Sequence, residues 1–169
     1  MDLLDRLLGH DTWTTRQLLD LLNDLSDDKL DRDFDIGHRT LRQTVAHVVS
    51  NIETWTDLMN EVPMRFKDSN DLSLTTLRRR YDVAVADFGK TARRLREKNK
   101  FDATYMDVLD EPPRAKSFGG TILHVLTHNH AHRTEVIHIL TRLGVENVIE
   151  GDLLSWEAAQ NSSEINYER

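Results

Sequence analysis

Apolar residues recur every three or four positions along most of this chain, which is the period of one face of an α-helix. The first such segment covers residues 3–25 and carries a stripe of leucines. A second covers residues 41–60, and a third runs from about residue 73 to residue 98. The fourth lies between Gly120 and Gly144, and the second of these glycines is a typical residue just beyond a helix end.

The segments between these helices are polar and of uneven length. Residues 26–40, "SDDKLDRDFDIGHRT", separate the first two helices, and a break at Pro63 separates the second from the third. Residues 101–120 contain β-formers, a proline pair and a glycine pair, a composition compatible with a small hairpin. A short helix at 152–160 follows, and the last nine residues are expected to fray. The pattern predicts an all-α fold, a four-helix bundle with long connections, in one domain spanning residues 1–169.

The composition limits which cross-links and metal ligands the chain can use. Its 169 residues are enough to bury a core without covalent cross-links. Because the chain has no cysteine, disulfides and thiolate metal sites are excluded. Any metal would need imidazole and carboxylate ligands.

Charge argues against a protein that binds nucleic acid. The formal net charge is −7, whereas binding to a phosphate backbone requires a basic surface. Two basic runs, at 77–80 and 92–98, share one predicted helix and are interpreted as a solvated helix face. Acidic residues begin at Asp2, so the amino terminus does not look like a signal peptide, and no segment approaches the roughly 20 apolar residues of a membrane span. We therefore expect a soluble cytoplasmic protein with no membrane partner.

Histidines are concentrated in the fourth predicted helix. His124, His128 and His132 are four residues apart, so they form one ladder on one helix face, while His130 points elsewhere. Two imidazoles one turn apart can hold the same zinc or nickel ion. Spacing alone does not decide whether the pair is His124 with His128 or His128 with His132, and such pairs also arise by chance. His138 lies more than a turn beyond the ladder.

A metal site needs a further ligand from another helix, and His47 in the second helix is the candidate. In a helix bundle, metal ligands project inward from facing helices. Three histidines with open coordination positions are typical of a catalytic centre, because structural zinc is more often closed by four protein ligands. The competing interpretation is that His47 is a buried histidine satisfied by a hydrogen bond.

The chain resembles the DinB-like family of four-helix-bundle proteins over nearly its whole length. The resemblance rests on the leucine-rich first helix with its polar loop, on "LRQTVAHVVSNIETWTDLM" with His47, Glu53 and Trp55, and on "HNHAHR" followed by "LGV". The family's metal ligands fall on three histidines of this chain: His47, His128 and His132. The resemblance therefore implies that His124 lines the pocket or contacts the ligands, and the family's trailing arginine falls on Arg133.

The chain departs from the family pattern next to the ligands. Ala131 stands where the family often has another histidine, and Thr134 and Glu135 stand in place of a Gly-Gln pair. Glu135 is three residues from His132, so it stays near the ligand face and could hydrogen-bond an imidazole or a bound water.

The resemblance implies a metal-dependent enzyme that uses nickel or zinc. The expected reaction is a thiol-dependent transfer or isomerisation, or a hydrolysis, of a small electrophilic substrate, with a low-molecular-weight thiol as a partner. The alternative is a non-enzymatic, metal-stabilised binding module that acts as a homodimer in a stress response. A homodimer is also the oligomeric state that we expect overall.

Overall fold

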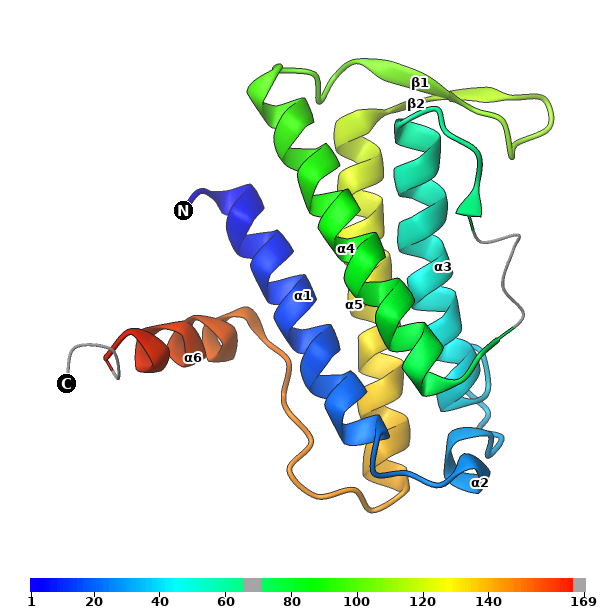
Figure 1. Cartoon of the computed structure of the whole chain (residues 1–169), viewed down its shortest axis with the longest axis vertical. Helices are drawn as coiled ribbons and strands as arrows, with labels where there is room; N and C mark the ends of the chain where they lie inside the picture. Colours follow the sequence, from blue (N-terminus) through cyan, green and yellow to red (C-terminus); the bar gives the residue numbers. More distant parts are fainter. Residues whose placement is uncertain (66–70, 166–169) are drawn as a thin grey trace.

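In the computed structural model, which describes residues 1–65 and 71–165 with side chains up to residue 161, four long helices form a bundle (Figure 1). They are listed in chain order: α1 (Leu3–Leu22), α3 (Leu41–Met59), α4 (Leu74–Glu97) and α5 (Phe118–Arg142). The prediction of an all-α four-helix bundle is confirmed. No helix in the described part of the chain is long and apolar enough to cross a membrane.

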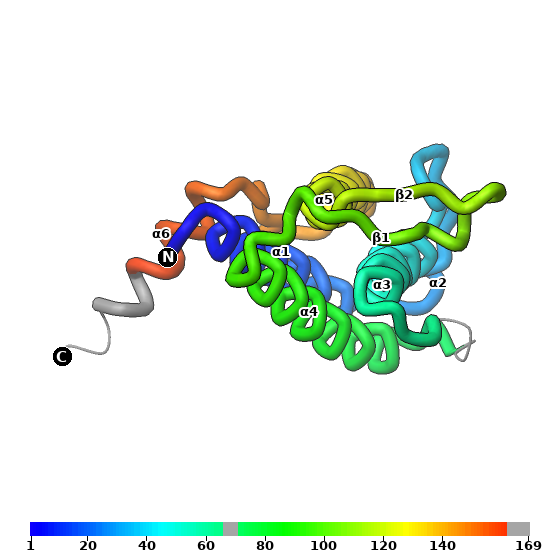
Figure 2. The backbone as a smooth tube through the Cα atoms, turned by 90° about the horizontal axis from the view of Figure 1, so that it is seen from above, coloured from blue at the N-terminus to red at the C-terminus, as the bar shows by residue number. Residues whose placement is uncertain are grey.

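The bundle has a down-up-up-down course in the view of Figure 1. Both α1 and α3 pack against α4 and α5, and Figure 2 shows the arrangement from above. Because α3 and α4 run in the same direction, the chain must return the length of the bundle between Met59 and Leu74. This explains the long polar connection seen in the sequence.

The apolar stripes predicted from periodicity meet along the bundle axis. The largest fully buried side chains come from all four long helices and include Leu22, Leu41, Ile52, Leu77, Tyr81, Phe88, Ile139 and Leu140. Burial of this apolar surface is the main stabilising contribution to the fold. The same packing fixes the rotation of each helix, and with it the direction in which the histidines point.

Two helix boundaries differ from the prediction. Helix α1 ends at Leu22 instead of residue 25, and the polar stretch after it contains a one-turn helix, α2 (Asp27–Leu30). Helix α5 begins at Phe118 and not after Gly120, because the Ser117 side chain accepts the Gly120 amide hydrogen and caps the helix there. The glycine pair thus belongs to the first turn of α5.

The predicted hairpin is present between α4 and α5. Strands β1 (Thr104–Asp107) and β2 (Arg114–Ser117) pair antiparallel, with Thr104 opposite Ser117. Strand β2 leads directly into α5, so the hairpin lies across the end of the bundle (Figure 1).

The terminal helix is longer than predicted. Helix α6 (Leu153–Ile165) leaves the bundle sideways and packs through Trp156 onto Gly9 of α1. A β-carbon at position 9 would lie 2.6 Å from the indole, so this contact needs a glycine. Part of the tail that was expected to fray, residues 166–169, lies outside the described residues.

Arginines in the two basic runs of α4 form ion pairs. Arg78 pairs with Asp20 of α1 at 2.5 Å, and Arg93 pairs with Asp5 at 2.8 Å. Arg80 differs from the predicted solvated face, because its side chain is only 12% exposed and contacts the buried Glu53 at 2.6 Å. These arginines tie α4 to its neighbours.

Candidate metal centre

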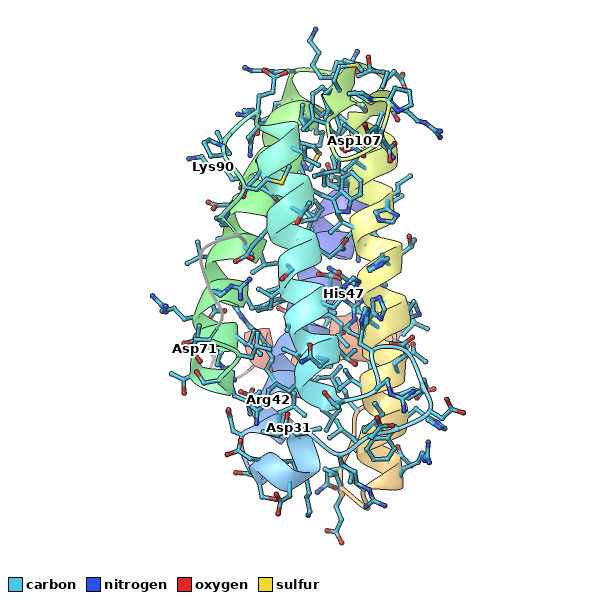
Figure 3. All side chains as sticks on the ribbon, turned by 90° about the vertical axis from the view of Figure 1, so that its right-hand side faces the viewer. Asp31, Arg42, His47, Asp71, Lys90 and Asp107 are labelled. Carbon is cyan, nitrogen blue, oxygen red and sulfur yellow. The ribbon has the colours of Figure 1, made fainter. Side chains whose placement is uncertain are left out.

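Four histidines gather along the seam between α3 and α5. The Nε2 atom of His128 lies 3.4 Å from Nε2 of His47 and 3.4 Å from Nε2 of His132. Figure 3 looks onto this seam and shows His47 of α3 facing α5. The three histidines singled out from the sequence are therefore neighbours in space.

The fourth member is His38, which the sequence pattern did not predict. Its ring stacks on His47 with centroids 3.9 Å apart and lies 5.1 Å from the His132 ring. Among the described residues, the group whose nitrogens all lie within 4.8 Å of one another, and which could hold a metal ion, is His38, His47 and His132; the sequence-predicted His128 is not in this group. No spacing rule connects His38, in the loop before α3, to a helical ladder. Only its position nine residues before His47 hinted at proximity.

The expectation that the ligands point into the bundle interior is wrong. His47, His128 and His132 are half-buried at the outer edge of the α3/α5 interface. The interior at this level is filled by the neighbouring helix positions, including the fully buried Asn129 and Arg133. Successive residues of a helix are about 100° apart around its axis, so Asn129 and His128 cannot both point inward. Because Asn129 is buried, the histidine ladder lies on the outer side of α5.

The pKa shifts of three rings in the cluster favour neutral imidazoles. Burial lowers the pKa of His47 to about 4, with further lowering by the charges of His38, His132 and His128. Burial is also the main cause that lowers the pKa of His38 and of His128. Neutral imidazole is the form that binds metal, so these rings are ligand-competent at neutral pH.

Glu135 fixes the orientation of one of these rings. Its Oε2 atom lies 2.8 Å from Nδ1 of His132, as expected for a carboxylate that accepts the Nδ1 hydrogen. The lone pair of His132 is then on Nε2, the atom that faces His128. The sequence prediction that Glu135 could hydrogen-bond an imidazole agrees with this contact.

Arg133 serves a different part of the molecule. It forms a buried ion pair with Asp11 of α1, and its Nη1 atom also lies 3.4 Å from Thr15 Oγ1. The side chains of Arg133 and Asp11 are 4% and 3% exposed. The arginine that follows the histidine pair therefore links α5 to α1 across the interior.

A pocket of about 400 Å³ opens beside the cluster, towards the hairpin. His124 lines it, with its ring 5.2 Å from the His128 ring and edge-on to Trp55 at 5.3 Å. The Lys116 ammonium lies 5.6 Å from the indole centroid and is held by Asp107 and Asp110.

A larger hollow of about 770 Å³ lies between α1, α4 and α6, and no histidine lines it.

The remaining histidines take no part in the cluster. His130 and His138 are exposed on other faces of α5, as predicted for His130. His10 is buried in α1, where its Nε2 lies 2.8 Å from the carbonyl oxygen of Gly151. These residues provide control positions for mutagenesis.

The donor set fits a divalent ion that prefers imidazole. Two nitrogens bound to one tetrahedral ion at 2.0–2.1 Å lie about 3.3 Å apart, close to the 3.4 Å that separates Nε2 of His128 from each partner. The carboxylate behind His132 is the outer partner that such sites use to orient a ligand.

Comparisons with known proteins show the family and agree with the helical fold. The family model described as the DinB superfamily matches residues 10–136. Among solved structures, the crystal structure of a DinB-like protein from Bacillus cereus ATCC 10987 is similar with a TM-score of 0.61 and 19% sequence identity. The match covers 80% of this chain and 87% of that one. No curated protein matches.

Proposed function

Because the chain belongs to the DinB superfamily, we propose that it is a metal-dependent enzyme whose nickel or zinc ion is held by His47, His128 and His132. One observation carries the proposal: the Nε2 atoms of His47 and His132 both approach Nε2 of His128 at 3.4 Å. The two contacts bring His47 and His132 close to His128, and nitrogens of His38, His47 and His132 lie within 4.8 Å of one another, which supports a shared metal ion at this seam.

The ligand type supports nickel or zinc over calcium or magnesium. The cluster offers imidazole nitrogens and one carboxylate, and the chain contains no thiolate. Imidazole donors suit zinc, copper, iron and nickel, whereas calcium and magnesium prefer oxygen.

The proposed reaction is the transfer of a low-molecular-weight thiol to a small electrophile. The alternative reaction is the hydrolysis of that electrophile. A divalent ion supplies Lewis acidity, which makes a thiol or water more acidic at neutral pH. The protein's own part is to keep His47 neutral by burial and to orient His132 through Glu135. Burial keeps the lone pair of His47 available without a proton having to leave first, and the contact with Glu135 sets the direction of the His132 ring.

The pocket beside His128 is the proposed place for the substrate. Trp55 supplies a flat apolar wall, and its indole N–H donates to Asn51 at 2.9 Å, so the ring is held in place. The neutral form of His124, whose pKa is lowered by burial and by Lys116, can both donate and accept a hydrogen bond. A small substrate with an apolar body and a polar end fits this lining.

Calorimetric titration with Ni²⁺ and Zn²⁺ tests the metal site. Wild type and the control His138→Ala, which removes an exposed histidine of the same helix, should each bind one ion per chain. His128→Ala should lose the binding or weaken it strongly. An unchanged stoichiometry and affinity in His128→Ala would remove the basis of the assignment.

Turnover tests the enzyme. We expect conjugation of a small thiol to members of an electrophile panel, or their hydrolysis, to be abolished by a chelator and restored by the metal. Trp55→Ala should raise KM without changing metal stoichiometry, because the indole contacts substrate and not the ion. Turnover that is insensitive to the chelator would refute a metal-dependent reaction.

A second candidate function is favoured by His38. A fourth imidazole would close the coordination shell, and closed four-ligand sites are typical of structural metals. The chain would then be a metal-stabilised binding module, acting as a homodimer in a stress response. It should show metal-dependent melting and no turnover, and light scattering should report a dimer.

A further inference from the structure

We propose that His38 is a fourth, displaceable ligand: the loop of residues 31–40 places it over the cluster, and a substrate must replace it to gain access. The inference rests on the proposed metal site and names how access to that site is controlled. It reconciles an open, catalytic triad on the helices with the presence of a fourth imidazole.

The position of the His38 ring supports a role as a ligand. One of its nitrogens lies within 4.8 Å of a donor nitrogen of both His47 and His132, and its ring centroid lies 5.1 Å from that of His132.

The loop is built to hold the ring there. The Phe34 amide donates to the Arg39 carbonyl, and the Arg39 amide donates to the Ile36 carbonyl, both at 2.8 Å. Phe34 itself is buried and anchors the loop to the bundle. Gly37 and Arg39 both have left-handed backbone angles, with φ of +48° and +71°. This tight turn directs the residue between them towards the seam.

The contact between Gly37 and Glu135 ties the loop to the opposite wall of the site. A β-carbon at position 37 would overlap the Glu135 Oε2 atom that bonds His132. Loop position and ligand orientation therefore depend on the same carboxylate.

His38 is the ligand that can leave. His47, His128 and His132 belong to long helices packed on the core, whereas His38 lies on a connecting loop and its ring is partly exposed. The Asp33–Arg39 ion pair beside it is 58% and 62% exposed, and ion pairs of that kind contribute little to stability. The turn that carries His38 can thus shift while Phe34 stays buried in the core.

Cobalt-loaded protein gives a readout of this ligand that does not need activity. Wild type titrated with CoCl₂ should develop the intense visible absorption of a four-coordinate ion. His38→Ala should bind Co²⁺ about tenfold or more weakly, with a changed spectrum, and added imidazole should restore the wild-type bands. The control His130→Ala, on the exposed face of α5, should match wild type.

A thiol probe tests displacement. 2-Mercaptoethanol should produce its sulfur-to-cobalt absorption band at a concentration about tenfold or more lower in His38→Ala than in wild type, because it no longer competes with an imidazole. His38→Gln, which keeps a polar side chain in the loop, should behave as His38→Ala does. Circular dichroism should show equal helix content in all variants.

Two outcomes would overturn the inference and can be told apart. Equal cobalt affinity, spectra and thiol titrations in wild type and both His38 variants would remove His38 from the site while leaving the three-histidine proposal intact. Failure of wild type itself to bind cobalt would refute the proposed metal site and the role of His38 together.

Discussion

Gly37 lies directly against the carboxylate of Glu135, so that a β-carbon on Gly37 would overlap Oε2 and lie 2.8 Å from Oε1. The same Oε2 atom is 2.8 Å from Nδ1 of His132. Through one carboxylate, the loop before α3 and the histidine ladder of α5 are placed relative to each other.

Gly37→Ala should affect stability and the site together. Gly37 has a φ of +48°, so an alanine there should cost about 1–2 kcal/mol of unfolding free energy. The clash itself can be relieved when the flexible Glu135 swings away, but the bond to His132 is then lost. Urea unfolding and Zn²⁺ titration would measure the two effects.

Gly144→Ala is the matched control for that variant. Gly144 has a φ of +71°, but a β-carbon added there would meet no atom within 4 Å, so it shares the backbone strain without the contact. Its stability loss should be similar and its metal affinity that of wild type. If Gly37→Ala also kept wild-type metal affinity, the Glu135 contact would have no role at the site.

Glu135→Ala should weaken metal binding by about 10–100-fold, the usual effect of removing a carboxylate that orients a ligand. Glu146→Ala, which removes an exposed carboxylate beyond α5, serves as the comparison. Adding Gly37→Ala to Glu135→Ala should lower affinity little further, because both changes remove the same contact. Additive losses would mean that the two residues act separately.

Metal-free protein should lose stability as pH falls from about 6.5 to about 4. The pKa of His47 is lowered to about 4 in the folded protein, whereas an unfolded chain has the ordinary value near 6.5. Between these values the unfolded state binds more protons, so the free energy of unfolding decreases as pH decreases. Urea titrations in chelator at about pH 7.5, 6 and 5, which bracket the ordinary histidine pKa, would follow it.

His47→Gln isolates that contribution from the carboxylates that also titrate in acid. Its unfolding free energy should fall less steeply between about pH 6.5 and pH 5 than that of wild type. Parallel pH profiles would show that His47 is not the group responsible.

Asp11→Ala should be strongly destabilising, by about 3–5 kcal/mol, because it leaves the Arg133 guanidinium buried without its partner. The double variant Asp11→Leu with Arg133→Met should recover much of the loss. Asp82→Ala, which breaks an exposed pair with Arg16, should cost less than about 1 kcal/mol. Thermal or urea unfolding of these variants would measure the structural contribution of the Arg133–Asp11 pair.

Periodicity was enough to predict the four long helices and the ladder that includes His128 and His132, and composition predicted the hairpin before the last helix. These features depend on neighbours within about one helical turn, so a linear sequence carries them. His47 was found because it is the one histidine within the second predicted helix. The boundary error at Phe118 arose where capping by a side chain overrode the periodic pattern.

The sequence by itself therefore determined the helices, their apolar faces and the helix positions of the three histidines that the family resemblance singles out. Only the tertiary structure decided that the cluster lies at the outer seam, that His38 joins it and that Glu135 meets Gly37. It also decided that Arg133 pairs with Asp11. The physical reason is that these relationships depend on two things: the rotation of each helix, which core packing sets, and the point at which a turn with left-handed backbone angles ends. Local residue spacing encodes neither of them.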